Sequence, residues 1–260
     1  MITELSGIDS GGSIGDAHEM NNPFRFKQFA VHQNLCAMKV GTDGILLGAW
    51  AQAAQPNRIL DIGTGTGLIA LMMAQRFPNA IVDSVEIESN AAEQAARNFS
   101  ASPWAERLNL HHQSIQSFTS SGLHNKAYSL IVSNPPWFVD SLKSVESSRN
   151  LARHADSLNH DELLNSVRLL LHSSGGFCVV LPSSDSASLI HSAHERSLFC
   201  RRQCHVRSKP GLSPHRVLLE FETAQVESSV IQQELIIENE QHHDYTDSFR
   251  GLTRDFYLRF

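Results

Sequence analysis

Long apolar runs are missing from this sequence. No segment approaches the roughly 20 consecutive apolar residues that a membrane-spanning helix requires, and the first residues lack the basic-then-apolar pattern of a secretory signal. The composition, 41% hydrophobic and 18% charged, is typical of an ordinary globular protein. We therefore expect a cytoplasmic protein with no membrane partner.

Cysteine is scarce as well, with four residues in the whole chain. Cys200 and Cys204 lie close together, but no second pair completes a zinc site. The fourteen histidines include two adjacent pairs, His111–His112 and His242–His243, and neither pair has a third partner at ligand spacing. We expect reduced thiols, histidines that are packed or solvated, and no metal ion.

An excess of positive charge is also absent, because 27 acidic residues outweigh 21 basic ones and the formal net charge is −6. Proteins that bind nucleic acid usually neutralise phosphates, so any such role needs a local basic face. The candidates for that face are Arg25 and Lys27, then Arg149 and Arg153, then Arg201, Arg202, Arg207 and Lys209. Each group could equally be a solvated surface, and the sequence leaves both interpretations open.

Strand-like and helix-like segments alternate after Pro56. Short runs rich in Ile, Val and Leu indicate strands at 58–62, 80–86, 108–113, 128–133 and 175–182. Helical patterns fall between them at 67–77, 89–99, 161–171 and 186–197. Such alternation predicts a parallel, doubly wound sheet with helices on both faces.

The two ends of the chain depart from that rhythm. Residues 1–22 carry little to bury and predict a disordered leader. Further along, the sequence indicates a hairpin at 24–31, a helix at 45–54, an antiparallel pair at 199–208 and 215–222, a short strand at 234–238 and a short terminal helix. We predict one domain at 23–260, with an extension at 23–55 and a core at 56–260.

A glycine-rich loop follows the first core strand and opens the first core helix. Its residues are Asp61-Ile62-Gly63-Thr64-Gly65-Thr66-Gly67, and glycines there let the backbone approach a ligand closely. Glu86 ends the second core strand, where a carboxylate can accept hydrogen bonds from ribose hydroxyls. The loop and the acid together predict a nucleotide-like cofactor.

The spacing of this loop separates two cofactor classes. Dinucleotide sites normally show GxGxxG, whereas this loop is DxGxGxG, with an acid two residues before the first glycine. A carboxylate suits a ligand that carries an ammonium group, as S-adenosylmethionine does, better than it suits a pyrophosphate. The spacing is typical of class I methyltransferases, and it favours them over NAD enzymes. The predicted α/β fold is therefore Rossmann-like: a seven-stranded, mostly parallel sheet with an antiparallel final hairpin and a short N-terminal hairpin and helix.

Asn134-Pro135-Pro136-Trp137 ends the fourth core strand. Two prolines cannot continue a central strand, because neither supplies a backbone N–H to the ladder. In a doubly wound sheet this corner falls at the carboxyl edge, where ligands bind. The tetrapeptide matches the [D/N]PP[Y/F/W] signature of methyltransferases that act on amino groups conjugated to a π-system.

The chemistry of such amino groups explains the residue types at the corner. An exocyclic adenine amine has a delocalised lone pair and is a poor nucleophile. The Asn134 side-chain oxygen and the Pro135 carbonyl can accept its two hydrogens, while Pro136 stiffens the corner and Trp137 offers a stacking face. The same motif serves adenine in DNA, adenine in RNA and the glutamine amide of release factors, so it leaves the substrate open.

The segment before the core is more specific. Phe26-Lys27-Gln28-Phe29, followed by AMKVGTDGILLGAW at 37–50, strongly resembles the bacterial tRNA1(Val) (adenine(37)-N6)-methyltransferases, which modify the purine just 3′ of the anticodon. The resemblance continues through VEIES, SPWAERLN, VSNPPW, Ala152-Arg153-His154, PHRVLLEF and DFYL, and covers nearly the whole chain after residue 23. Release-factor methyltransferases differ here, because they carry a separate helical domain before the glycine loop.

The resemblance implies a role for each matching position. The anticodon loop of a tRNA is the implied partner and S-adenosylmethionine the implied cofactor. Residues implied to hold the cofactor are Asp61, Gly63, Gly65 and Gly67 at its methionine part, Glu86 at its ribose, and Thr42, Asp43 and Gly44 closing over it. Asn134, Pro135, Pro136 and Trp137 would hold the adenine, and Arg25 and Lys27 are implied RNA contacts. Arg149 and Arg153, from the basic groups named above, are further candidate RNA contacts.

Two positions depart from the family pattern. Ser114 stands where the family commonly has an Asp that contacts the cofactor's adenine amine, so we expect that contact to be weaker or made by backbone. Trp137 stands where Tyr is usual, and an indole stacks at least as well. We therefore expect N6-methylation of adenine 37 in tRNA-Val. Methylation of an adenine N6 in ribosomal RNA or of a glutamine N5 in a protein are the alternatives, and Asp61, Glu86 and Asn134 argue against a non-catalytic RNA-binding protein.

Overall fold

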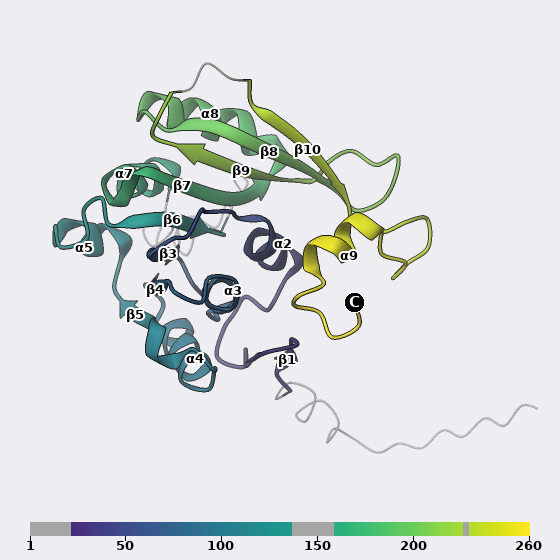
Figure 1. Ribbon diagram of the computed structural model, residues 1–260, viewed down its shortest axis with the longest axis horizontal. Helices are drawn as coiled ribbons and strands as arrows, with labels where there is room; N and C mark the ends of the chain where they lie inside the picture. The colour runs from purple at the N-terminus through teal and green to yellow at the C-terminus, as the bar shows by residue number, and fades with distance from the viewer. Residues whose placement is uncertain (1–21, 137–158, 226–228) are drawn as a thin grey trace, which may run out of the picture.

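An eight-stranded sheet organises the computed structural model, which describes residues 22–136, 159–225 and 229–260 (Figure 1). Its strand order is β10-β8-β9-β7-β6-β3-β4-β5. The strands are β3 (Arg58–Ile62), β4 (Ile81–Glu86), β5 (Leu108–His112), β6 (Tyr128–Ser133), β7 (Leu171–Pro182), β8 (Phe199–Arg207), β9 (Arg216–Glu222) and β10 (Ile231–Ile236). The neighbours from β5 to β7 pair in parallel, whereas β9 pairs antiparallel with both β7 and β8.

Helices cover both faces of this sheet. They are α2 (Thr42–Trp50), α3 (Leu68–Arg76), α4 (Ser89–Ser100), α5 (Ile115–Ser120), α7 (His160–Leu170), α8 (Ser186–Glu195) and α9 (Asp247–Thr253), with short 3-10 turns η1 (Ala105–Arg107) and η2 (Ser183–Asp185). Successive strand residues point to opposite faces, so Ile59 joins the core beneath α2, α3 and α4, and Leu60 joins the core beneath α5, α7 and α8. The predicted doubly wound α/β fold is confirmed.

The predicted strand count is one short. The short strand expected near 234–238 is β10, and it extends the sheet to eight by pairing in parallel with β8. Most of its side chains are exposed, so its sequence carries a weak core signal. Gln233 of β10 accepts a hydrogen bond from the Trp50 indole at 2.9 Å, which ties this edge strand to α2.

The N-terminal extension packs onto the core sheet. A small antiparallel hairpin, β1 (Phe24–Arg25) with β2 (Ala30–Val31), comes before α2, and α2 packs against α3, α9, β7 and β9. Arg202 of β8 anchors the end of α2, since its guanidinium lies 3.7 Å from the centre of the Trp50 ring and bonds the Trp50 carbonyl at 3.1 Å. Arg202 is only 7% exposed and is paired with Glu220, so it belongs to the interior and not to a basic surface.

Among the residues that the structure describes, no helix is both long and apolar enough to cross a membrane.

Candidate active site

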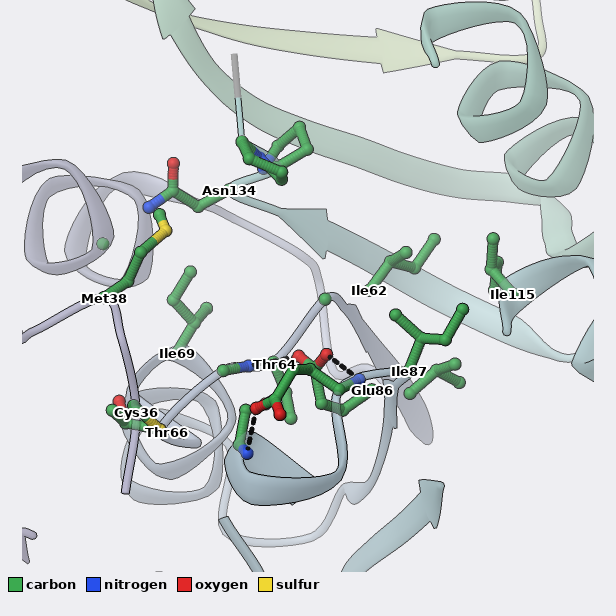
Figure 2. A pocket seen from close by; sticks show the side chains of 18 of the residues that line it. Cys36, Met38, Ile62, Thr64, Thr66, Ile69, Glu86, Ile87, Ile115 and Asn134 are labelled. Atoms are coloured by element: carbon green, nitrogen blue, oxygen red, sulfur yellow. Dashed lines mark hydrogen bonds between the residues drawn. The ribbon is translucent and has the colours of Figure 1, made fainter. Parts of the chain in front are cut away.

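A cavity of about 620 Å³ lies at the carboxyl ends of β3, β4 and β6. Its walls come from several parts of the chain: the glycine loop after β3, the end of β4, the Asn134 corner after β6, the starts of α5 and α7, and the extension at 36–40 together with Gly44. Open α/β sheets bind ligands at this edge, where neighbouring parallel strands end together. Figure 2 shows Thr64 beside Glu86, Thr66 beside Cys36 at the left, and Asn134 and Met38 above them.

The glycine loop forms an open cradle. Gly63 and Gly65 have positive φ angles of 71° and 56°, and a Cβ placed on either would meet nothing within 4 Å. Both glycines line the cavity, so their backbone is free to face a ligand. Gly67 has a different task, because a Cβ there would lie 2.5 Å from the Phe99 ring. It does not line the cavity and instead allows α3 to begin against α4.

Asp61 lies beneath this loop and is completely buried. Its Oδ2 accepts hydrogen bonds from the Thr64 hydroxyl at 2.6 Å and from the Ala70 N–H at 3.2 Å. Its Oδ1 is buried without a partner among the described residues. Burial raises the pKa of Asp61 from its usual 3.8 to about 7, with the charge of Glu86 adding to the rise and the two hydrogen bonds opposing it. Asp61 does not line the cavity, so its charge would favour a cationic ligand from beneath the glycine loop and not by direct contact.

Glu86 faces the cavity from the end of β4. Its two oxygens accept backbone N–H groups from Gly65 at 2.8 Å and Glu88 at 2.9 Å, which fixes the carboxylate beside the glycine loop. A carboxylate has about four acceptor positions, so capacity remains for two hydroxyls. This is the arrangement that a ribose requires.

An apolar slot continues from Glu86. Ile62, Ile87 and Ile115 line it, and Figure 2 shows their side chains grouped on the side of the cavity away from Met38. Ser114 borders the slot, but its hydroxyl caps α5 by accepting from the Ser117 N–H at 3.1 Å. A flat adenine fits between such isoleucines, and the residues present therefore fit S-adenosylmethionine: acid for the ammonium, acid for the ribose and an apolar slot for the base.

The corner after β6 borders the other end of the cavity. Ser133 ends the strand and is tied down, because its buried hydroxyl donates to the Ile62 carbonyl at 2.9 Å. Asn134, Pro135 and Pro136 follow and line the cavity. A Cβ on Gly44 would lie 3.9 Å from the Asn134 Nδ2, so the first turn of α2 passes directly beside this amide. The predicted Trp137 lies outside the described residues, as do Arg149 and Arg153.

The extension supplies a wall that the sequence analysis did not assign to the site. Cys36, Ala37, Met38, Lys39 and Val40 line the cavity. Burial raises the pKa of the Cys36 thiol to about 11, with Glu86 and Glu88 adding to the rise, so the thiol stays protonated and is a poor nucleophile. Chemistry that begins with a cysteine thiolate does not suit this cavity.

The predicted Thr42-Asp43-Gly44 loop is the first turn of α2, and its three residues differ in their relation to the cavity. Gly44 lines the cavity, whereas Thr42 and Asp43 do not. Asp43 accepts a hydrogen bond from Arg216 at 2.8 Å, and Arg216 pairs with Pro182 across β7 and β9. This ion pair fastens the helix that carries Gly44 to the sheet edge.

The two described RNA candidates near the N-terminus differ in their surroundings. Arg25 is exposed on β1. The Lys27 ammonium donates to the carbonyls of Arg254 at 2.5 Å and Phe260 at 2.7 Å, so it holds the C-terminal segment. Within the C-terminal group of basic residues, Arg207 pairs with Glu234 and Lys209 lies 4.0 Å from Glu238.

Further cavity residues were missed from the sequence. Thr64 and Thr66 are the intervening positions of the glycine loop, and that loop was the signal available for them. Asn159 and Glu162 also line the cavity and form a capping box at the start of α7. A polar residue followed three positions later by Glu is a visible helix-start signal, but nothing local connects it to the cavity.

One prediction about the histidines needs a correction. Glu238 approaches His242 and His243 in the turn after β10, so the pair does have a third potential ligand nearby. His242 Nδ1 lies 3.2 Å from the Glu238 carboxylate, and the His243 N–H donates to the same carboxylate at 3.0 Å. These residues do not line the cavity.

Comparison with known proteins places this chain among methyltransferases. The family model described as "Methyltransferase small domain" matches residues 38–180. The chain is 48% identical to a tRNA1(Val) (adenine(37)-N6)-methyltransferase of Phocaeicola vulgatus, over 92% of this chain and 99% of that protein. It is 46% identical to the protein of the same name from Parabacteroides distasonis, over 92% of this chain and 100% of that one.

The likeness extends to solved structures. A predicted O-methyltransferase from Agrobacterium tumefaciens superposes with a TM-score of 0.64 at 18% identity, covering 82% of this chain and 96% of that chain. At this identity the match establishes the fold alone. It agrees with the α/β fold described above.

Proposed function

The chain belongs to the tRNA1(Val) (adenine(37)-N6)-methyltransferase family, and from that premise we propose that it methylates N6 of adenine 37 in tRNA-Val, using S-adenosylmethionine. The position of Asn134 is the observation that supports this proposal. Its amide lies at the end of β6, in the same cavity as the glycine cradle and the Glu86 carboxylate. An amide acceptor beside a cofactor site is what an amino group of low nucleophilicity requires.

Residues of the glycine loop and of β4 would hold the cofactor. The open backbone at Gly63 and Gly65 would face its methionine part, the buried charge of Asp61 would favour its ammonium, and Glu86 would accept from its ribose hydroxyls. Ile87 and Ile115 would enclose its adenine. When bound, this cofactor supplies a methyl group that its sulfonium already activates.

The corner residues would orient the target amine. The Asn134 side-chain oxygen and the Pro135 carbonyl can each accept one N–H, which localises the lone pair of the nitrogen and favours positive charge on it. Two prolines after Asn134 fix the backbone so that these acceptors keep one direction. The amine loses its extra proton after transfer, and solvent at the cavity mouth can take it without a dedicated base.

The proposal also covers the domain organisation, the RNA substrate and the cellular location of the protein. We infer that residues 23–260 act as one unit, because Phe26, Trp50 and Ile59 belong to one core cluster. The substrate is a tRNA anticodon loop, whose unpaired bases can leave their stack and enter a pocket. An RNA of this kind is modified in the cytoplasm, which is where we place the protein.

Transfer of a labelled methyl group tests this function. Purified protein is incubated with methyl-labelled S-adenosylmethionine and one of four acceptors: tRNA-Val, the same tRNA with guanine at position 37, ribosomal RNA, and a release factor. We expect label in the first acceptor only, recovered as N6-methyladenosine after digestion to nucleosides. Label in ribosomal RNA or in the release factor, with none in tRNA-Val, would contradict the proposal and identify the alternative.

A further inference from the structure

Met38 occupies an unusual position for a large apolar side chain. It lines the cavity yet is 58% exposed, whereas Met72 and Met73 in α3 are completely buried. Figure 2 shows its side chain reaching toward Asn134, at the end of the cavity away from Glu86 and the isoleucine slot. The cavity therefore has two apolar parts, and the proposed cofactor positions occupy only one of them.

The segment that carries Met38 is held firmly in place. Asn98 of α4 accepts from the His32 N–H at 3.0 Å and donates to the His32 carbonyl at 2.8 Å. Gln94 of the same helix accepts from the Leu35 N–H at 3.1 Å. Both glutamine and asparagine are themselves buried, so α4 anchors the start of the segment.

The segment is also closed on itself around Met38. The Lys39 ammonium donates to the carbonyls of Gln33 at 2.7 Å and Cys36 at 3.1 Å, while the Gln33 side chain accepts from the Val40 N–H at 2.7 Å. The Lys39 ammonium is therefore bonded to backbone carbonyls of the loop itself. Because Lys39 and Val40 are both hydrogen-bonded within the loop, Met38 is presented at a fixed place at the mouth of the cavity.

We propose that Met38 is a substrate-binding residue whose thioether packs against the ring of the target adenine. This is the adenine whose amine donates a hydrogen bond to Asn134. The inference rests on the proposed function and adds a residue that packs against the base. A thioether is polarizable and makes favourable contacts with aromatic rings, and an unbranched side chain adapts to a ring that enters from solution. Exposure without the substrate and burial with it explain why an apolar residue stands at this edge.

Steady-state kinetics of a Met38→Ala variant with a tRNA-Val anticodon stem-loop test the assignment. We expect KM for the RNA to rise about tenfold, as loss of one buried apolar side chain at an interface predicts. The dissociation constant for S-adenosylhomocysteine, measured by calorimetry, is expected to change by less than about twofold, and Tm to stay within about 1 °C because the side chain is exposed. Met38→Leu keeps a side chain of similar size and is expected to recover most of the wild-type KM.

Leu258→Ala is the matched control. Leu258 is also 58% exposed and does not line the cavity, so its loss is expected to leave KM for the RNA unchanged. If the wild type methylates the stem-loop and Met38→Ala shows the same KM for the RNA, the inference about Met38 is overturned and the proposed function stands. Equal weakening of S-adenosylhomocysteine binding would overturn it too, by placing Met38 against the cofactor. Absence of any wild-type methylation of the stem-loop and of full-length tRNA-Val would contradict the proposed function itself.

Discussion

Two buried aspartates on neighbouring strands have opposite surroundings. Asp83 in β4 is surrounded by donors: Arg58 at 2.5 Å, Tyr128 at 2.9 Å and Asn109 at 3.0 Å, with His111 at 3.5 Å. Asp61 at the end of β3 has two donors on one oxygen and none on the other. Burial alone would raise the pKa of both. For Asp83 the surrounding hydrogen bonds outweigh burial and hold the pKa well below its usual range, whereas for Asp61 burial prevails.

The difference separates groups that serve the fold from groups that serve a ligand. A buried polar atom without a partner costs stability, and Asp61 keeps such an atom beneath the glycine loop that lines the cavity. The same division recurs between adjacent residues at the end of β6, where the Ser133 hydroxyl bonds the Ile62 carbonyl and the Asn134 that follows lines the cavity. Substitutions on the two sides of this division should therefore affect different measurements.

Asn134→Ala is expected to have the largest effect. It removes an acceptor that acts on charge developing in the transition state, and loss of one such group typically costs about 10²–10³ in kcat. Single-turnover methylation of tRNA-Val measures the rate, and calorimetry with S-adenosylhomocysteine checks that the cofactor site is intact. Ser133→Ala is the neighbouring control, expected to lower Tm while keeping a kcat near that of wild type. Full activity in Asn134→Ala would contradict the mechanism even with the substrate correct.

Asp83→Ala should act on stability instead. It leaves the Tyr128 hydroxyl and the Asn109 amide with lost partners in the interior, and removing one member of a buried charged network costs about 3 kcal/mol. Urea denaturation followed by circular dichroism measures the free energy of unfolding. Asp255, with 76% of its side chain exposed, offers a control whose replacement by Ala should cost less than about 0.5 kcal/mol. The cofactor affinity of the folded variant is expected to match wild type.

Asp61→Asn should show the reverse pattern. The amide keeps an oxygen for the Thr64 hydroxyl and the Ala70 N–H but removes the charge, so we expect cofactor affinity to fall about 30-fold, roughly 2 kcal/mol. Stability is expected to be unchanged or higher, because a buried charge without a full set of partners has been removed. Calorimetry and urea denaturation on the same preparation give both numbers. A large loss of stability with unchanged affinity would show that Asp61 serves the fold, as Asp83 does.

Much of this architecture was accessible from sequence because it is encoded locally. Alternating apolar runs predicted the strands and helices, and the glycine loop with its flanking acid marked the carboxyl edge of β3. The proline pair marked the end of β6 for the same reason, since a strand cannot pass through it. The position of Asn134 beside the loop then follows from parallel pairing of β3 with β6.

The remainder depends on contacts between distant segments. Nothing near Asp43 indicates that its partner is Arg216, and nothing near Gly67 indicates Phe99. Arg202 reads as a surface charge in a basic run, yet it is buried against Trp50. The cavity wall at 36–40 was missed because its lining role is set by hydrogen bonds to α4, and no spacing rule relates those two segments.

The pH dependence of the two aspartates offers the smallest but most direct comparison. For Asp83 the folded pKa lies below the unfolded value of 3.8, so its stabilising contribution is complete above about pH 4 and is lost as pH falls further. For Asp61 the folded pKa of about 7 lies above the unfolded value, so the folded protein binds the proton more tightly and this group's contribution to stability falls as pH rises from 4 to 7.

An ammonium ligand needs the ionised form of Asp61. Cofactor affinity should therefore tighten about eightfold between roughly pH 6 and pH 7.5, since the ionised fraction of a group with that pKa grows by about this factor. Calorimetry across this range measures the slope, and Asp61→Asn should flatten it, whereas an equal slope in that variant would assign the titration to another group.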